Sequence, residues 1–207
     1  GQMPLTLVLF YYNSQNGGTL DSLNEVVESM DFSAVGMPHN LTLFLMLLMF
    51  VMAMIGLYVG VVKFHKRDFK TIWTGRRKID YSRILFAFLV WISIAILSEF
   101  ISYLITPDNY VLTLEWQPFL ILLIICLTLL PVQTTFEELF VRGYLMQAFG
   151  LVFHKRWMPI VVTSMIFGGL HMMNPEVREF GLCTMMFYYV GIAVFLGVLP
   201  FWMMDCN

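Results

Sequence analysis

Apolar runs of helical length follow one another along most of the chain. A helix needs about 20 apolar residues to cross a hydrocarbon core about 30 Å thick. Five runs reach or approach that length, at residues 41–62, 82–105, 118–136, 158–172 and 181–202. A sixth run, at 3–12, is too short to span a membrane alone. The pattern predicts an all-α polytopic transmembrane helix bundle with about five spanning helices and a partial N-terminal one.

The two ends of the chain indicate a piece of a longer protein. It begins Gly-Gln-Met and ends at Asn207, directly after an apolar run. We therefore expect the run at 3–12 to be the tail of an earlier helix. A signal peptide is the alternative, but no basic residue precedes the run and no small-residue cleavage site closes it. No internal repeat or low-complexity linker divides the chain, so we expect one membrane domain over 1–207.

The basic residues alternate between the polar connections. Loop 63–83 contains Lys63, Lys66, Arg67, Lys70, Arg76, Arg77, Lys78 and Arg83, and the turn at 154–157 adds Lys155 and Arg156. Residues 13–40 and 106–117 contain neither Lys nor Arg. Because basic loops stay in the cytoplasm, we expect 63–83 and 154–157 on the cytoplasmic side. We interpret 63–83 as a loop that sets topology, rather than as a lipid-headgroup signalling site.

The composition argues against a water-soluble protein, against nucleic-acid binding and against cysteine chemistry. Apolar residues make up 59% of the chain and charged residues 13%, and the mean hydropathy is +0.76, outside the usual range of soluble proteins. The lipid bilayer is therefore the expected surrounding. A net charge of -2 provides no basic surface for nucleic acid. The three cysteines, Cys126, Cys183 and Cys206, have no ligand spacing, and we interpret them as small hydrophobic residues.

Four ionisable residues lie in or beside the apolar runs, where charge is costly. Glu138 and Arg142 are four residues apart, with the acid first, which favours an ion pair on one helix face. Glu137 is turned about 100° away and has no partner at helical spacing. A carboxylate held by Arg stays ionised, whereas its neighbour in a poorly hydrated place is suited to act as a general base.

His171 is expected to face Glu137 across a helical hairpin. The two lie symmetrically about residue 154, in the basic turn, so antiparallel helices bring them to one level. Gly168 and Gly169 permit a close helix approach. A carboxylate opposite an imidazole can activate water, directly or on a metal. A structurally buried histidine and an ion-pair staple in a transporter or scaffold are the alternatives, and Glu99 is a further candidate.

The sequence gives two different estimates for the depth of this site in the membrane. At 1.5 Å per residue, Glu137 lies about 30 Å from Gln117 on the outer side, whereas His171 lies about 21 Å from Trp157 on the inner side. The two values agree only if Pro131 bends the third helix or if the hairpin at 137–157 projects past the membrane face.

The sequence Glu137-Glu138-x-x-x-Arg142-Gly143, followed by Phe167-x-x-x-His171, resembles the first two motifs of the CPBP intramembrane endopeptidases. This family contains the CAAX prenyl proteases and the bacteriocin-processing or self-immunity (Abi) proteins. The resemblance covers about residues 80–205 and is closest to bacterial members, which implies a multi-pass protein of the bacterial inner membrane. It implies that Glu137 activates water, that Glu138 and Arg142 position the site, and that His171 binds this water or a metal such as zinc.

The chain departs from the family pattern after His171. The family has a further helix that carries His and, four residues on, Asn, but no His follows His171 here. His39, His65 and His154 fall in predicted loops and do not substitute. We therefore expect the third motif beyond Asn207. Catalytic zinc usually has three protein ligands, so Glu137 and His171 are only part of a metal site.

Two functions remain open from the sequence. One is an endopeptidase that cleaves a peptide or protein tail at a membrane-embedded site. The other is a non-proteolytic immunity or scaffold protein with the same fold.

Overall fold

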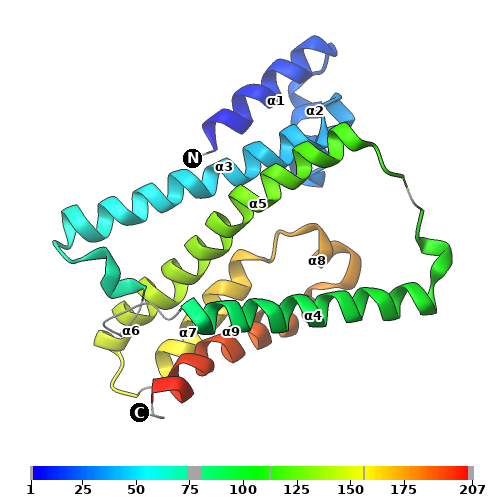
Figure 1. Ribbon diagram of the computed structural model, residues 1–207. Helices are drawn as coiled ribbons and strands as arrows, with labels where there is room; N and C mark the ends of the chain where they lie inside the picture. The colour runs from blue at the N-terminus through cyan, green and yellow to red at the C-terminus, as the bar shows by residue number, and fades with distance from the viewer. Residues whose placement is uncertain (1, 74–80, 112, 156, 205–207) are drawn as a thin grey trace.

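The protein is helical throughout the ranges that the structure describes. A computed structural model describes residues 2–73, 81–111, 113–155 and 157–204, and all of its regular elements are helices (Figure 1). The all-α prediction is thereby confirmed. Among the residues named above, Arg76, Arg77, Lys78, Arg156, Cys206 and Asn207 lie outside these ranges.

The helical elements follow the predicted runs closely. They are α1 (Met3–Gln15), α2 (Leu20–Ser29), η1 (Phe32–Val35), α3 (His39–Val59), η2 (Gly60–Phe64), η3 (Phe69–Ile72), α4 (Tyr81–Ile105), η4 (Pro107–Asn109), α5 (Trp116–Glu138), η5 (Leu139–Leu145), α6 (Met146–Val152), α7 (Met158–Leu170), α8 (Pro175–Phe180) and α9 (Leu182–Met204). Of these, η2 and η5 are π-helical, and η1, η3 and η4 are 3₁₀-helices.

Three of the described helical stretches are long and apolar enough to cross a membrane. They are His39–Phe64, Phe88–Ile105 and Trp116–Val152, and the shorter Met158–Leu170 and Leu182–Val198 are also apolar. Each of these five stretches overlaps one predicted run, but Trp116–Val152 continues well past the end of the predicted run at 118–136. The structure is thus consistent with a helical membrane bundle.

Helices α3 and α5 pack side by side and run in the same direction (Figure 1). At their starts, Asn40 Nδ2 donates a hydrogen bond to the carbonyl oxygen of Pro118 at 2.8 Å. At the other end, His65 Nε2 lies 2.9 Å from the Tyr144 hydroxyl. The connection between two parallel neighbours must return along their whole length, and α4 makes this return. The alternation of basic residues between the loops likewise predicts that one helix crosses the membrane between α3 and α5.

The helix that carries the two glutamates extends beyond a bilayer core. From Trp116 to Val152 it runs for 37 residues without interruption, through Pro131 and the π-helical segment η5. At 1.5 Å per residue this is about 55 Å, against about 30 Å of hydrocarbon. This length favours a projecting hairpin as the explanation for the two depths of the site.

Helices α7 and α9 form a close antiparallel pair. A Cβ atom added to Gly168 would lie 2.6 Å from Val190 Cγ2, so this position requires glycine. Toward the other end of the pair, a Cβ on Gly197 would lie 3.0 Å from Ile160. Gly169 was also predicted to permit close packing, but its Cβ would meet open space because this face of α7 points away from α9. That part of the prediction is wrong.

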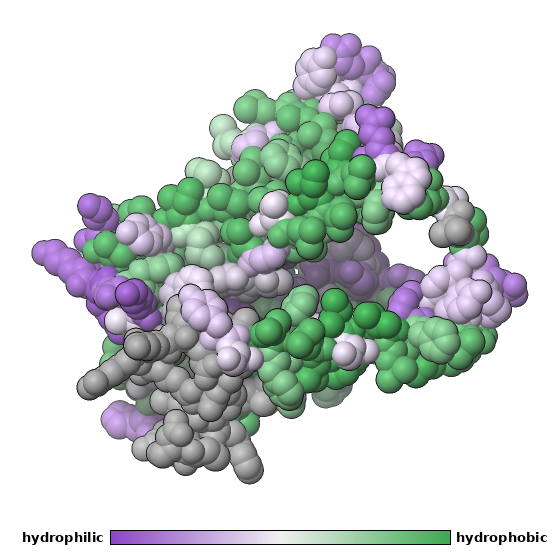
Figure 2. All heavy atoms as spheres, viewed as in Figure 1, coloured by the Kyte–Doolittle hydropathy of each residue, from purple (hydrophilic) through white to green (hydrophobic). Residues whose placement is uncertain are grey.

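Helix α4 lies apart from the other spanning helices. Every described side chain of α4 is exposed, and Figure 2 shows its surface as largely hydrophobic. Such a helix is suited to face lipid on all sides. Near its end, Glu99 accepts a hydrogen bond from the Tyr110 hydroxyl at 2.9 Å. This contact links α4 to the connection that leads to α5, and a functional role for Glu99 stays a prediction.

We expect the connections on the two sides of α4 to lie on opposite faces of the membrane. In a variant with the three native cysteines changed to serine, Lys66→Cys should react with an impermeant maleimide only from the cytoplasmic side. Asp108→Cys should react only from the other side, because eight basic residues resist translocation. Labelling of both positions from one face of sealed, oriented vesicles would overturn this topology.

We expect Gly168→Ala to destabilise the protein by about 1 to 3 kcal/mol, because the added methyl group overpacks the contact with Val190. Gly169→Ala is the matched control. It adds the same methyl group where nothing lies within 4 Å and should raise stability by up to about 1 kcal/mol through helix propensity. Thermal unfolding of both variants in one detergent measures the difference, and equal effects would contradict the packing.

Candidate active site

The first motif lies where α5 changes into the π-helical segment η5. Glu137 and Glu138 are the last residues of α5, and Arg142 lies in the middle of η5. π-Helical turns are rare and occur frequently at functional sites. Arg142 Nη1 donates to Glu138 Oε1 at 2.6 Å, which confirms the predicted ion pair. The Arg142 side chain is 9% exposed, whereas that of Glu138 is 47% exposed.

Arg142 also connects this helix to the two that follow. Its Nη2 atom donates to the carbonyl oxygen of Ala193 in α9 at 3.2 Å. Its guanidinium carbon lies 5.5 Å from the centroid of the Phe167 ring in α7, a cation–π distance. One side chain therefore holds three helices together. Within the described ranges, its Nε atom is buried without a hydrogen-bond partner.

Glu137 has a different environment from Glu138. Its Oε1 atom accepts a hydrogen bond from Gln133 Nε2 at 3.2 Å, one helical turn earlier. The prediction that Glu137 has no partner at helical spacing is therefore wrong, because only charged partners were considered. The amide of Gln133 is neutral, so it orients the carboxylate without neutralising it. Glu137 is half-buried and keeps an oxygen for a further interaction.

His171 caps the end of α7 with its ring fixed in place. Its Nδ1 atom lies 2.8 Å from the carbonyl oxygen of Phe167. Because a carbonyl oxygen only accepts, we assign the proton of the neutral imidazole to Nδ1. The Nε2 atom is then free to accept a proton or to bind a metal. The ring lies between Phe167 and Tyr189, with centroids at 4.3 and 4.8 Å.

Two polar side chains beside His171 were not predicted as site residues. Tyr189 lies in α9, and its hydroxyl accepts a hydrogen bond from Asn174 Nδ2 at 3.2 Å. Asn174 follows His171 by three residues, but the motifs provide no role for it. Tyr189 lies in an apolar run, and a tyrosine in such a run does not by itself indicate a functional residue. Neither residue can be identified as part of the site from the sequence, because only the packing of α9 against α7 brings them together.

The structure brings the two motifs together through Phe167. Arg142 packs on one side of this ring and His171 on another, which gives a continuous path from Glu138 to His171. Arg142 and Phe167 are symmetric about 154.5, in agreement with the predicted hairpin. No direct hydrogen bond joins Glu137 to His171 among the described residues. Their facing arrangement remains a prediction.

A three-ligand zinc site is not assembled by the described residues alone. No group of three or more His, Cys, Asp or Glu side chains gathers within these ranges. Glu137 and His171 remain a predicted partial ligand set, which does not fit the three protein ligands of catalytic zinc. The two motifs and their neighbours contribute a carboxylate, an imidazole nitrogen, a tyrosine hydroxyl and a buried guanidinium, which are chemical groups able to bind water.

Comparison with known proteins covers the same part of the chain. Residues 115–203, from α5 to α9, match the family described as type II CAAX prenyl endopeptidase Rce1-like. A relative from Bacillus subtilis (strain 168), named uncharacterized protein YyaK, is 35% identical over 138 residues. The match covers 66% of this chain and 46% of the relative, so the chain spans less than half of its length. No solved structure matches.

Proposed function

We propose that the chain, which matches the Rce1-like CAAX endopeptidase family over residues 115–203, serves peptide-bond hydrolysis at a membrane-embedded site. The substrate is the tail of a peptide or protein. The observation that carries this proposal is the set of contacts around Arg142. They join the glutamate motif to the Phe167 ring, and this ring packs on His171.

The proposed chemistry uses a water molecule held between Glu137 and His171. Glu137 removes a proton from the water, and the resulting hydroxide attacks the carbonyl carbon of the peptide bond. His171 orients the water through its free Nε2 atom. When the tetrahedral intermediate collapses, the C–N bond breaks and the proton held by Glu137 passes to the leaving amine. Glu137 returns to its carboxylate form.

Glu138 and Arg142 act on this chemistry through position. Their ion pair occupies the guanidinium, and within the part of the chain that the structure describes Glu137 has only the neutral amide of Gln133 as its side-chain partner. The contacts of Arg142 to Ala193 and Phe167 set the distance between the helices that carry the reacting groups. A displacement of about 1 Å at such a site is enough to lower the rate substantially.

Tyr189 is suited to stabilise the negative charge of the intermediate. Its hydroxyl accepts a hydrogen bond from Asn174, so its own proton is available for donation to an oxyanion. Its ring packs on the His171 ring, with the two centroids 4.8 Å apart, and this contact supports a role for the hydroxyl next to His171.

We expect Glu137→Gln to abolish hydrolysis with little loss of stability, because the amide keeps the shape but cannot take a proton. Arg142→Ala should lower activity and stability together, with a loss of about 1.5 to 3 kcal/mol from the hydrogen bonds that the guanidinium makes to Glu138 and Ala193. The assay follows cleavage of a quenched fluorogenic peptide library by the natural protein that contains this sequence, purified in detergent, with thermal unfolding in parallel.

The result separates the two functions left open by the sequence. Hydrolysis that persists in Glu137→Gln, or no hydrolysis by the wild-type protein with its fold intact, would favour the non-proteolytic alternative. Equal stability losses in the two variants would contradict the division between a reacting and a structural carboxylate.

We expect Tyr189→Phe to lower kcat by about 10²- to 10³-fold, the effect of removing one donor to an oxyanion. KM and the unfolding temperature should change little, because the ring and its packing on His171 remain. Tyr188→Phe is the matched control, since it removes the hydroxyl of the neighbouring, exposed tyrosine. Equal kcat values for the two variants would remove Tyr189 from the mechanism.

A further inference from the structure

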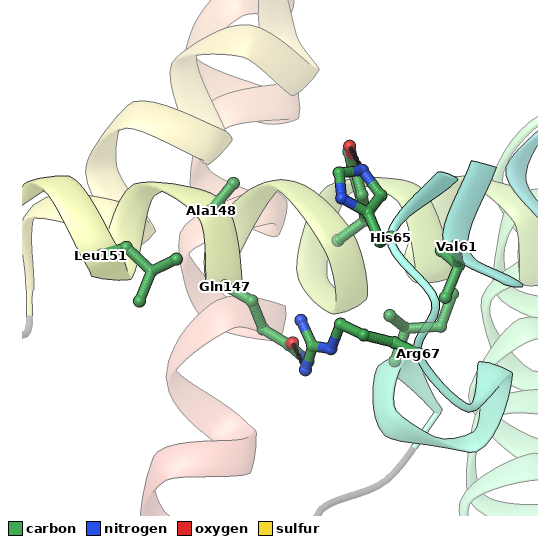
Figure 3. Close-up of a pocket in the computed structure, with 8 residues that line it drawn as sticks. Val61, His65, Arg67, Gln147, Ala148 and Leu151 are labelled. Atoms are coloured by element: carbon green, nitrogen blue, oxygen red, sulfur yellow. Dashed lines mark hydrogen bonds between the residues drawn. The ribbon is translucent and has the colours of Figure 1, made fainter. Parts of the chain in front are cut away.

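A cavity of about 250 Å³ opens where the end of α3 meets the segment from η5 to α6. Figure 3 shows His65 and Arg67 on one wall and Gln147, Ala148 and Leu151 on the other. We call this cavity the interfacial pocket. It is separate from the candidate active site, because none of its lining residues belongs to either motif.

The interfacial pocket is held open by two π-helical segments. Val61 lies in η2, His65 follows it directly, and Tyr144 lies in η5. Opposite them, a Cβ atom on Gly143 would lie 2.4 Å from the Ile72 carbonyl oxygen, so glycine lets η3 pack directly on η5. The pocket is thus formed by close backbone packing and not by a loose surface loop.

The wall formed by His65 and Arg67 is polar, and hydrogen bonds connect it to the opposite wall. Arg67 Nη2 donates to Gln147 Oε1 at 3.1 Å, and Gln147 Nε2 donates to the carbonyl oxygen of Thr71 at 2.9 Å. The bond to Gln147 uses one of the five N–H donors of the guanidinium, so the fork has capacity for an anion. The His65 ring is held by its hydrogen bond to Tyr144.

The segment that forms this wall carries a net positive charge. Within 63–73 the sequence contains Lys63, Lys66, Arg67 and Lys70 but only one acid, Asp68. The carboxylate of Asp68 accepts from the backbone N–H of Lys70 at 3.0 Å and so serves as a helix cap. The ligand that this wall selects is therefore an anion.

The rest of the pocket lining is mainly apolar. Val61 and Ile72 are buried at its base, whereas Leu151 at the opening is 91% exposed. The nearby Phe64 and Trp73 are also exposed, and aromatic residues gather at membrane–water interfaces. Figure 2 shows polar side chains at this end of α3, next to the apolar surface of the helices.

We propose that the interfacial pocket binds the phosphate group of an anionic phospholipid, with Arg67 and His65 at the phosphate and Leu151 beside the acyl chains. Basic pockets at the cytoplasmic ends of membrane helices are suited to lipid headgroups. A bound headgroup would contact Tyr144, which lies in the π-helical segment that carries Arg142, and Gln147, which lies just after this segment. The inference does not depend on whether the protein is a protease.

The test measures binding of dioctanoyl phosphatidylglycerol to the purified protein in a neutral detergent. We expect saturable binding that weakens ten- to a hundredfold in Arg67→Gln, the loss of a hydrogen bond to a charged group. Ala148→Phe should weaken it similarly by filling the pocket without a change of charge. The matched controls are Lys70→Gln and Val152→Phe, outside the pocket, with losses of about fivefold or less.

Two further ligands identify the source of the phosphate. Dioctanoyl phosphatidylcholine, with no net charge, should bind at least tenfold more weakly. Inorganic phosphate that binds as tightly as the anionic lipid and displaces it would overturn the lipid assignment. A loss in Lys70→Gln equal to that in Arg67→Gln would show diffuse attraction instead of a site. Unchanged binding by a folded Ala148→Phe variant would also overturn the proposal.

Discussion

Burial of the Arg142 guanidinium is the constraint on which the arrangement of α5, α7 and α9 depends. A cation removed from water is tolerated only when counter-charge and hydrogen bonds surround it. Glu138 provides the charge, the Ala193 carbonyl an acceptor and Phe167 an aromatic face, each from a different helix. Phe167 and Ala193 lie on α7 and α9, which pack closely where Gly168 faces Val190.

The π-helical turn η5 connects two separate features of the protein. Arg142 contacts α7 and α9, whereas Tyr144 contacts His65 at the end of α3. Gly143, between them, packs against the backbone of η3. Any shift of this turn therefore moves both the candidate active site and the interfacial pocket. The long helix from Trp116 to Val152 places both near the end that projects toward loop 154–157.

Contacts between residues close together in the sequence could be predicted, whereas contacts between residues far apart could not. The pair of Glu138 and Arg142 is set by a spacing of four on one helix, and the hairpin about residue 154 by helical rise. Both were derived from the sequence, and the ion pair was confirmed. The partner of Glu137 is also local, but Gln133 was missed because an amide in an apolar run carries no charge signal. Gly169 was misplaced because two adjacent glycines do not reveal which one faces α9.

The sequence by itself determined the all-helical class, the positions of the apolar helices and the residues of the two motifs. Hydropathy and helical periodicity are local properties, so they can be derived from the sequence without knowledge of the fold. Only the tertiary structure decided that Ala193 meets Arg142, that Tyr189 meets His171, and that His65 meets Tyr144 at a separation of 79 residues. The reason is physical: helices that are apolar on all sides carry no periodic pattern to set their rotation or their neighbours, which packing alone selects.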